Sequence, residues 1–129
     1  MNLEVGTIYK KDIVITEKAV SDFAILSNDM NPLHLDDEYA SKSIFKKRVV
    51  HGMLIVSYLS GILGMDFPGK GTIYLSQNIN FIRPVFVGET IKFLLTVIDA
   101  ESHNKFRIRT NVYNERDELV IDGEARVKI

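Results

Sequence analysis

The chain has 129 residues, of which 46% are hydrophobic and 26% charged, and its formal net charge is -1 at pH 7. This size and composition predict one folded domain over residues 1–129 and exclude a disordered chain. The near-neutral charge provides no long-range field for nucleic acid or an anionic membrane, so neither is expected as a partner. Since the chain has no cysteine, disulfides, thiolate metal sites and a cysteine nucleophile are excluded.

The first third of the chain predicts one strand followed by short helices. Residues 5–15 contain β-favouring side chains, and Thr16 is expected to cap the first helix. A second short helix is expected over residues 37–44, with Asp36 at its N-cap. Its expected packing side chains are Tyr39, Ala40 and Ile44.

The longest stretch without a charged side chain is residues 52–65. It is shorter than the ~18 to 20 residues that cross a bilayer, so it predicts a buried helix that is apolar on all sides. Residues 1–6 lack the basic and apolar regions of a signal peptide. A cytoplasmic location without membrane association is therefore expected.

The rest of the chain alternates apolar and polar side chains, as strands with one buried face do. The four segments are residues 71–81, 90–97, 105–113 and 119–129. In the first of them the apolar set is Ile73, Leu75, Ile79 and Phe81. Turn-forming residues at 84–88, 102–104 and 114–117 have the spacing of an antiparallel meander. The pattern predicts an α+β domain, a curved antiparallel sheet around a long central helix.

Two segments carry residues suited to chemistry. The first contains Asp29 and His34 on either side of an Asn-Pro pair, which favours a bend, and the second contains His51-Gly52 at the start of the uncharged helix. A carboxylate and an imidazole on one short loop are suited to acid-base catalysis, and helix N–H groups beside a glycine to binding an oxyanion. This favours chemistry on a carbonyl compound. The alternative is that the Asn-Pro segment is only a capped turn.

Other polar residues are less specific. His51 either assists the site or caps and packs the helix, and His103 is expected in an exposed turn. The spacing of Asp29, His34 and His51 matches no zinc pattern, so no metal is expected. A basic cluster either forms a solvated helix edge or docks an anionic ligand. It consists of Lys42, Lys46, Lys47 and Arg48.

The longer motif Asp29-x-Asn31-Pro32-x-His34-x-Asp36, with Tyr39-Ala40, Phe45 and Val50-His51-Gly52-Met53, resembles the MaoC-like dehydratase family. Within that family it is most similar to the R-specific enoyl-CoA hydratases. The resemblance continues through Ser60-Gly61, Pro68-Gly69-Lys70-Gly71, Ser76-Gln77 and residues 83–89, so it covers most of the chain.

The resemblance implies the hot-dog fold, in which a sheet wraps a long central helix. It implies reversible hydration of trans-2-enoyl-CoA to (R)-3-hydroxyacyl-CoA without a cofactor, in fatty acid metabolism or in the supply of polyhydroxyalkanoate precursors. It also implies a homodimer, or a higher homo-oligomer, with each acyl tunnel along the subunit boundary.

The resemblance implies roles for single residues. Asp29 and His34 would hold the water that adds to C3 and exchange the proton at C2, while the Gly52 N–H would polarise the thioester carbonyl. Many relatives have glycine where this chain has Asn28, and asparagine tolerates positive φ, so the loop geometry is expected to be kept.

Further residues are expected at the substrate. Ser60 and His51 would lie near the acid-base pair, and Asn31 would order the loop. The acyl pocket is expected to be lined by Leu59, Leu63 and Met65.

Three alternatives stay open at this point. The same chemistry on acyl carrier protein would make the chain a (3R)-hydroxyacyl-acyl carrier protein dehydratase. A hot-dog thioesterase is disfavoured because such enzymes lack the Asp-x-Asn-Pro-x-His loop. A non-catalytic acyl-thioester sensor is disfavoured because both proton carriers are present.

Overall fold

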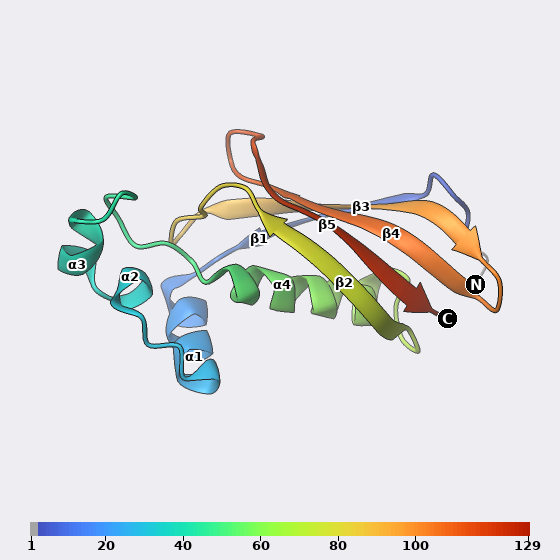
Figure 1. Cartoon of the computed structure of the whole chain (residues 1–129), viewed down its shortest axis with the longest axis horizontal. Coiled ribbons are helices and arrows are strands. Elements are labelled where there is room, and N and C mark those ends of the chain that lie inside the picture. The colour runs from blue at the N-terminus through green and yellow to red at the C-terminus, as the bar shows by residue number, and fades with distance from the viewer. Residues whose placement is uncertain (1–2) are drawn as a thin grey trace.

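A computed structural model describes residues 3–129 of the chain (Figure 1). The elements in chain order are β1 (Ile8–Val14), α1 (Glu17–Ser27), α2 (Pro32–Leu35), α3 (Asp37–Ser41), α4 (Gly52–Gly61), the π-helical turn η1 (Ile62–Asp66), β2 (Ile73–Phe81), β3 (Thr90–Glu101), β4 (Lys105–Tyr113) and β5 (Leu119–Lys128). One antiparallel sheet curves over α4, and α1, α2 and α3 gather beyond the end where α4 begins. This is the hot-dog arrangement, and it confirms the predicted fold class.

The strand order in the sheet is β1-β3-β4-β5-β2. The predicted hairpins β3–β4 and β4–β5 are present, but β2 pairs with β5 and not with β3. The expectation of a simple meander is therefore wrong for residues 84–88, which connect strands that are not neighbours. Side-chain alternation predicts which face of a strand is buried, but it does not determine which strand lies beside it.

The core lies between the sheet and α4. Ile91, Phe93, Leu95 and Val97 of β3 are all fully buried, as their alternation predicts. They belong to the same cluster as Leu59 of α4. Burying a side chain of this size stabilises a fold by roughly 1.5 to 3 kcal/mol, so this contact fixes α4 against the sheet.

The central helix differs from the prediction in two ways. Its α-helical part ends at Gly61, and η1 completes the uncharged stretch. It is also not buried on all sides, because Met53 is 56% and Met65 63% exposed. Figure 1 shows the reason, since the sheet covers α4 on one side only.

Strand β2 also departs from its sequence pattern. Ile73 is 55% and Leu75 41% exposed, although the alternation assigned both to the buried face. The register of β2 against β5 shifts between Tyr74 and Ser76. Such a bulge reverses the side-chain direction along a strand, so that Tyr74 before it and Ile79 after it both pack against the core.

The short helices begin at capping residues. Thr16 accepts a hydrogen bond from the Ala19 N–H, and Asp36 accepts one from the Tyr39 N–H, which confirms both predicted caps. Helix α3 ends at Ser41, earlier than predicted, and only Ala40 of its expected packing residues is buried. Tyr39 and Ile44 are exposed. Within residues 3–129, no helix is long and apolar enough to cross a membrane.

Candidate active site

The loop between α1 and α2 is held by local hydrogen bonds. Asn28 ends α1 in the left-handed conformation with φ 62°, as its asparagine side chain allows. The Asn31 N–H donates to Oδ1 of Asp29 at 3.3 Å, and Oδ1 of Asn31 accepts from the Leu33 N–H at 3.1 Å. The Asn-Pro segment is therefore a capped turn, and the helix that it caps presents His34.

Residues 49–51 run alongside this loop and are bonded to it. The Val49 N–H donates to the Leu33 carbonyl at 3.3 Å, and Nδ1 of His34 lies 2.7 Å from the Val49 carbonyl oxygen. A carbonyl oxygen only accepts, so Nδ1 of His34 donates and its Nε2 faces no protein donor among the described residues. Val50 fixes this 49–51 segment to the β2–β3 connection through a 2.7 Å bond from its N–H to the Val85 carbonyl.

Three titratable side chains converge here. The polar side-chain atoms of Asp29, His34 and His51 lie within 4.8 Å of one another. The His51 ring stacks on the His34 ring with centroids 3.8 Å apart and planes 28° apart. Burial lowers the pKa of His51 below its ordinary value, and the neighbouring His34 acts in the same direction. The structure thus brings together the acid-base pair that the sequence indicated, with His51 against it.

The same three residues do not form a metal site in this arrangement. An imidazole binds a metal through a lone pair in the ring plane at about 2 Å. The ring centroids are 3.8 Å apart and the stacked planes are only 28° from parallel, so the planes meet several ångströms beyond that distance. One ion therefore cannot be bound by both imidazoles without breaking the stack.

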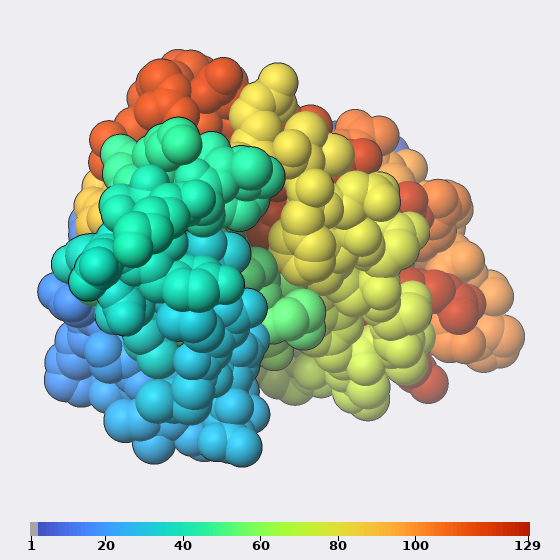
Figure 2. Space-filling view, turned by 60° about the vertical axis from the view of Figure 1, so that its left-hand side comes forward, coloured from blue at the N-terminus to red at the C-terminus, as the bar shows by residue number. Residues whose placement is uncertain are grey.

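A pocket of about 440 Å³ opens at the acid-base pair. Figure 2 shows it as the hollow between the segment after α3 and the end of β2, with β5 visible at its floor. Its lining includes Asp29, His34, Phe45, His51, Gly52, Phe81, Arg83 and Ile121. Gly52 is the first residue of α4, and its N–H makes no hydrogen bond to any described residue. A helix N–H of this kind is suited to binding an oxyanion.

Several predicted site residues do not reach this pocket. Leu59 and Leu63 are buried in the core, whereas Ser60 and Met65 are exposed, and none of the four lines the pocket. The helix rises about 1.5 Å per residue, so these four residues lie about two or more turns along it from Gly52. In the single chain, neither the three residues expected at the acyl pocket nor Ser60, expected near the acid-base pair, lines this pocket. Their role at the substrate stays a prediction about an assembly.

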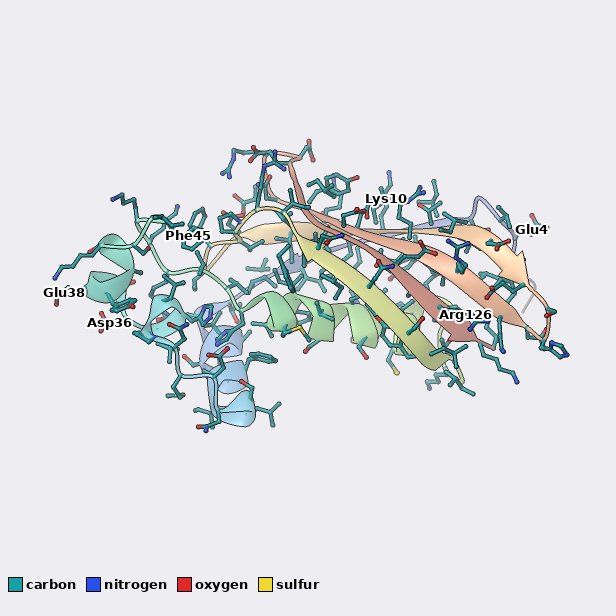
Figure 3. The ribbon with its side chains drawn as sticks, in the orientation of Figure 1. Glu4, Lys10, Asp36, Glu38, Phe45 and Arg126 are labelled. Carbon is teal, nitrogen blue, oxygen red and sulfur yellow. The ribbon has the colours of Figure 1, made fainter. Side chains whose placement is uncertain are left out.

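The remaining polar candidates lie away from the pocket. Asp36 is the cap of α3, at the outer end of the helical region beside Glu38, as Figure 3 shows. His103 is in an exposed turn, as predicted. Neither lines the pocket.

The basic cluster does not act as one surface. Arg48 is turned inward, with its side chain 10% exposed, and its Nε donates to the His34 carbonyl at 2.8 Å. Its Nη1 also donates to Glu17 at 2.7 Å. Lys42 pairs with Glu38, and Lys47 lies over the Phe86 ring. Neither alternative for the cluster describes Arg48, which instead holds α2 in place.

Sequence reasoning missed the contribution of β2 to the pocket. Phe81 ends this strand, and its ring carbons lie within 3 Å of where a Cβ on Gly52 would be. Arg83 lies beside it and donates to the Leu119 carbonyl at 2.8 Å. No local signal places either residue at the site, because the contact joins segments about thirty residues apart.

The fold and the site together define a hot-dog domain with an acid-base pair beside an unpaired helix N–H. The model of the MaoC like domain matches residues 4–118, and the chain belongs to this family. The chain is 39% identical over 129 residues to an (R)-specific enoyl-CoA hydratase of Aeromonas caviae, covering 99% of this chain and 96% of that protein.

Two further comparisons support the same assignment. A mitochondrial 3-hydroxyacyl-[acyl-carrier-protein] dehydratase of Arabidopsis thaliana is 39% identical over 127 residues, covering 95% of this chain and 75% of that protein. The solved structure of an (R)-hydratase from A. caviae involved in PHA biosynthesis has a TM-score of 0.95 at 40% identity, covering 98% of this chain and 97% of that one. These similarities confirm the family and the fold that the sequence motif predicted.

Proposed function

We propose that the protein is an R-specific enoyl-CoA hydratase, which adds water reversibly to trans-2-enoyl-CoA and gives (R)-3-hydroxyacyl-CoA. The observation that carries the proposal is the convergence of Asp29 and His34 at a pocket that also contains the unpaired Gly52 N–H. The near-complete match to the A. caviae hydratase supports the same reaction.

Each residue has a defined task in this reaction. Asp29 and His34 hold the water, remove a proton from it as its oxygen bonds to C3, and deliver a proton to C2, so the pair ends in its starting protonation state. The Gly52 N–H donates to the thioester oxygen, where negative charge collects. A donor of this kind typically stabilises a transition state by about 3 to 4 kcal/mol.

The arrangement of His34 supports its part in the proton transfer. Its Nδ1 donates to the Val49 carbonyl, which leaves Nε2 for the water. A fixed tautomer of this kind spares the enzyme from reorienting the ring during the reaction.

The reaction chemistry is the same for both carriers of the acyl group, because CoA and acyl carrier protein present the same phosphopantetheine arm. The A. caviae relative supports CoA, and the A. thaliana relative supports the alternative, a (3R)-hydroxyacyl-acyl carrier protein dehydratase. The inward position of Arg48 reduces the basic surface that would dock an acidic carrier protein. A role in supplying polyhydroxyalkanoate precursors is part of the CoA proposal, and similarity to the A. caviae (R)-hydratase involved in PHA biosynthesis supports it.

A homodimer is also part of the proposal. Strand β2 lies at one edge of the sheet and exposes Ile73 and Leu75, while α4 exposes Met53 and η1 exposes Met65. A bare strand edge with apolar side chains is rarely left in water. A second copy that pairs β2 with β2 would cover this surface and place Ser60 and Met65 at the subunit boundary.

The function is tested with purified protein and crotonyl-CoA, together with longer trans-2-enoyl-CoA esters. We expect loss of the conjugated double bond without release of free CoA, and a product that an S-specific hydroxyacyl-CoA dehydrogenase does not oxidise. Strong NADH formation with that coupling enzyme would refute the R stereochemistry. Rapid release of CoA, detected with a thiol reagent, would favour the thioesterase alternative. Faster turnover of crotonyl-acyl carrier protein would favour the dehydratase alternative.

A further inference from the structure

His51 lies just before α4 and is almost completely buried, with 2% of its surface exposed. Its side chain makes no capping hydrogen bond to the helix, so the sequence-based alternative of a helix cap does not describe it. Instead its Nε2 lies 3.1 Å from the backbone carbonyl oxygen of Asp29. The residue therefore contacts the loop that carries the acid-base pair.

The hydrogen bond fixes the tautomer of His51. A carbonyl oxygen has no proton to give, so Nε2 is the donor. Nδ1 is buried and has no hydrogen-bond partner among the described residues. If Nδ1 carried a proton as well, a buried cation would lack an acceptor, which is far more costly than an unpaired lone pair. The ring is therefore neutral, with its proton on Nε2.

The faces of the same ring are also occupied. His34 stacks on it at 3.8 Å between centroids, and Phe23 of α1 meets it edge-on at 5.0 Å. Asp29 and His34 are the titratable groups of the described chain that face it, and Phe23 carries no charge. The His34 ring stacked against it also disfavours a positive charge on His51, because two stacked cations would repel each other.

The 49–51 segment thus contacts both members of the acid-base pair. Val49 accepts from the His34 ring, and two residues later His51 donates to the Asp29 backbone and supports the His34 ring plane. The Val50 bond to Val85 ties the segment to the sheet connection that lines the pocket. The distance between the carboxylate and the imidazole therefore depends on this segment.

We propose that His51 is a positioning residue, which holds Asp29 through its backbone carbonyl and holds the ring plane of His34 by stacking, while staying neutral itself. The inference rests on the proposed function where enzyme activity is measured, and not where the protonation of His51 is measured. It assigns His51 no contact with the substrate.

Two substitutions separate positioning from packing. His51→Phe keeps the ring but removes the donor, whereas His51→Gln removes the ring but places an amide N–H near the position of Nε2. A displacement of the reacting groups by about 1 Å typically costs on the order of 100-fold, so we expect His51→Phe to lower kcat ~10- to 100-fold with little change in KM. His51→Gln should recover most of that loss. If packing were the role, His51→Phe would be the more active variant, and that result would overturn the proposal.

A second measurement does not depend on activity or on the variants folding. The chain has three histidines, so ¹⁵N-edited NMR resolves all of them. We expect His51 to carry a single proton, on Nε2, at neutral pH. A His51 that carries its proton on Nδ1, or on both ring nitrogens, would refute the proposal even if the hydratase assay succeeds. An inactive wild-type protein with the expected His51 tautomer would refute only the proposed reaction.

Discussion

The ring of Phe81 lies directly against Gly52, so closely that a Cβ on residue 52 would clash with Cε1 of that ring. Phe81 comes from the end of β2 and Gly52 from the start of α4, and both line the pocket. The absence of a side chain at position 52 therefore lets an aromatic ring approach the helix N-terminus. The N–H proposed to bind the thioester oxygen lies at this contact.

We expect Gly52→Ala to lower kcat/KM by roughly 100- to 1,000-fold, as loss of an oxyanion donor does, because alanine keeps the N–H but blocks the thioester from reaching it. Phe81 is 56% exposed, so its ring has room to move aside and the free energy of unfolding should change little. The displaced ring and the new methyl group would still occupy the place of the thioester. Urea unfolding and steady-state kinetics measure the two effects.

The double variant Gly52→Ala with Phe81→Leu provides the matched control, because the smaller side chain removes the clash. Partial recovery of activity in the double variant would support the contact as the cause. Gly52→Ala with wild-type activity would contradict binding of the thioester at this contact.

The acid-base pair gives the second prediction. Asp29→Asn and His34→Ala should each lower kcat by at least ~100-fold, the magnitude typical of acid-base groups. His103→Ala is the matched control, since His103 lies in an exposed turn outside the pocket and its loss should not affect turnover. Circular dichroism checks that each variant is folded. Near wild-type turnover of crotonyl-CoA by a folded Asp29 or His34 variant would show that the assigned roles are wrong.

The features that could be predicted from the sequence are those that depend on residues close together along the chain. The caps at Thr16 and Asp36 and the left-handed Asn28 all depend on residues within three positions, and all were predicted. The burial of the inward side of β3 was predicted as well, because alternation records it directly. The acid-base loop belongs to the same class, since its turn chemistry is local.

The features that were missed depend on distant parts of the chain. The bulge after Tyr74 is visible only once β2 is paired with β5, and without it the exposed Ile73 looks like a core residue. The inward turn of Arg48 brings it to Glu17, thirty-one residues earlier in the chain. The approach of Phe81 to Gly52 requires the strand order, which the alternating pattern does not contain.

Arg48 gives the third prediction. Its Nε donates to the His34 carbonyl, and a hydrogen bond from a charged group contributes about 1.5 to 3 kcal/mol. Because Glu17 is 70% exposed, the ion pair between Arg48 and Glu17 should add little. We therefore expect Arg48→Met to lower the free energy of unfolding by about 1 to 3 kcal/mol, and Arg48→Lys to restore little, since lysine lacks the two-sided fork.

Lys42→Met is the control for the loss of a positive charge in the same segment. Lys42 is 77% exposed and 3.5 Å from Glu38, so its removal should change stability by no more than about 0.5 kcal/mol. Equilibrium unfolding in urea at one protein concentration compares the variants. Equal stability of Arg48→Met and Lys42→Met would contradict the structural role of Arg48.

The fourth prediction concerns pH. His51 titrates near pH 6.5 in the unfolded chain, and burial lowers its pKa in the folded protein. Between the two values the unfolded chain binds more protons, so the stability that neutral His51 contributes is complete above pH 6.5 and declines as the pH falls below it. His51→Gln should therefore lose less stability than the wild type between about pH 7.5 and about pH 5.5.

Comparing the two proteins cancels the contributions of other groups, among them Glu89, whose pKa is raised by burial and whose effect has the opposite sign. Urea unfolding at both pH values measures the difference. The same loss of stability in the wild type and in His51→Gln would mean that His51 titrates alike in the folded and unfolded chains.

The last prediction concerns assembly. The two edges of the sheet, β1 and β2, each carry half-exposed apolar side chains, Val14 at 51% and Ile73 at 55%. Only β2 adjoins the proposed subunit boundary, so Ile73→Lys should prevent the dimer and Val14→Lys should not. An obligate interface commonly buries more than ~2,000 Å² in total, so the Ile73→Lys monomer should also lose most of its activity, at least ~10-fold. Sedimentation equilibrium combined with the crotonyl-CoA assay decides the matter, because a fully active wild-type monomer, or equal behaviour of the two variants, would refute pairing through β2.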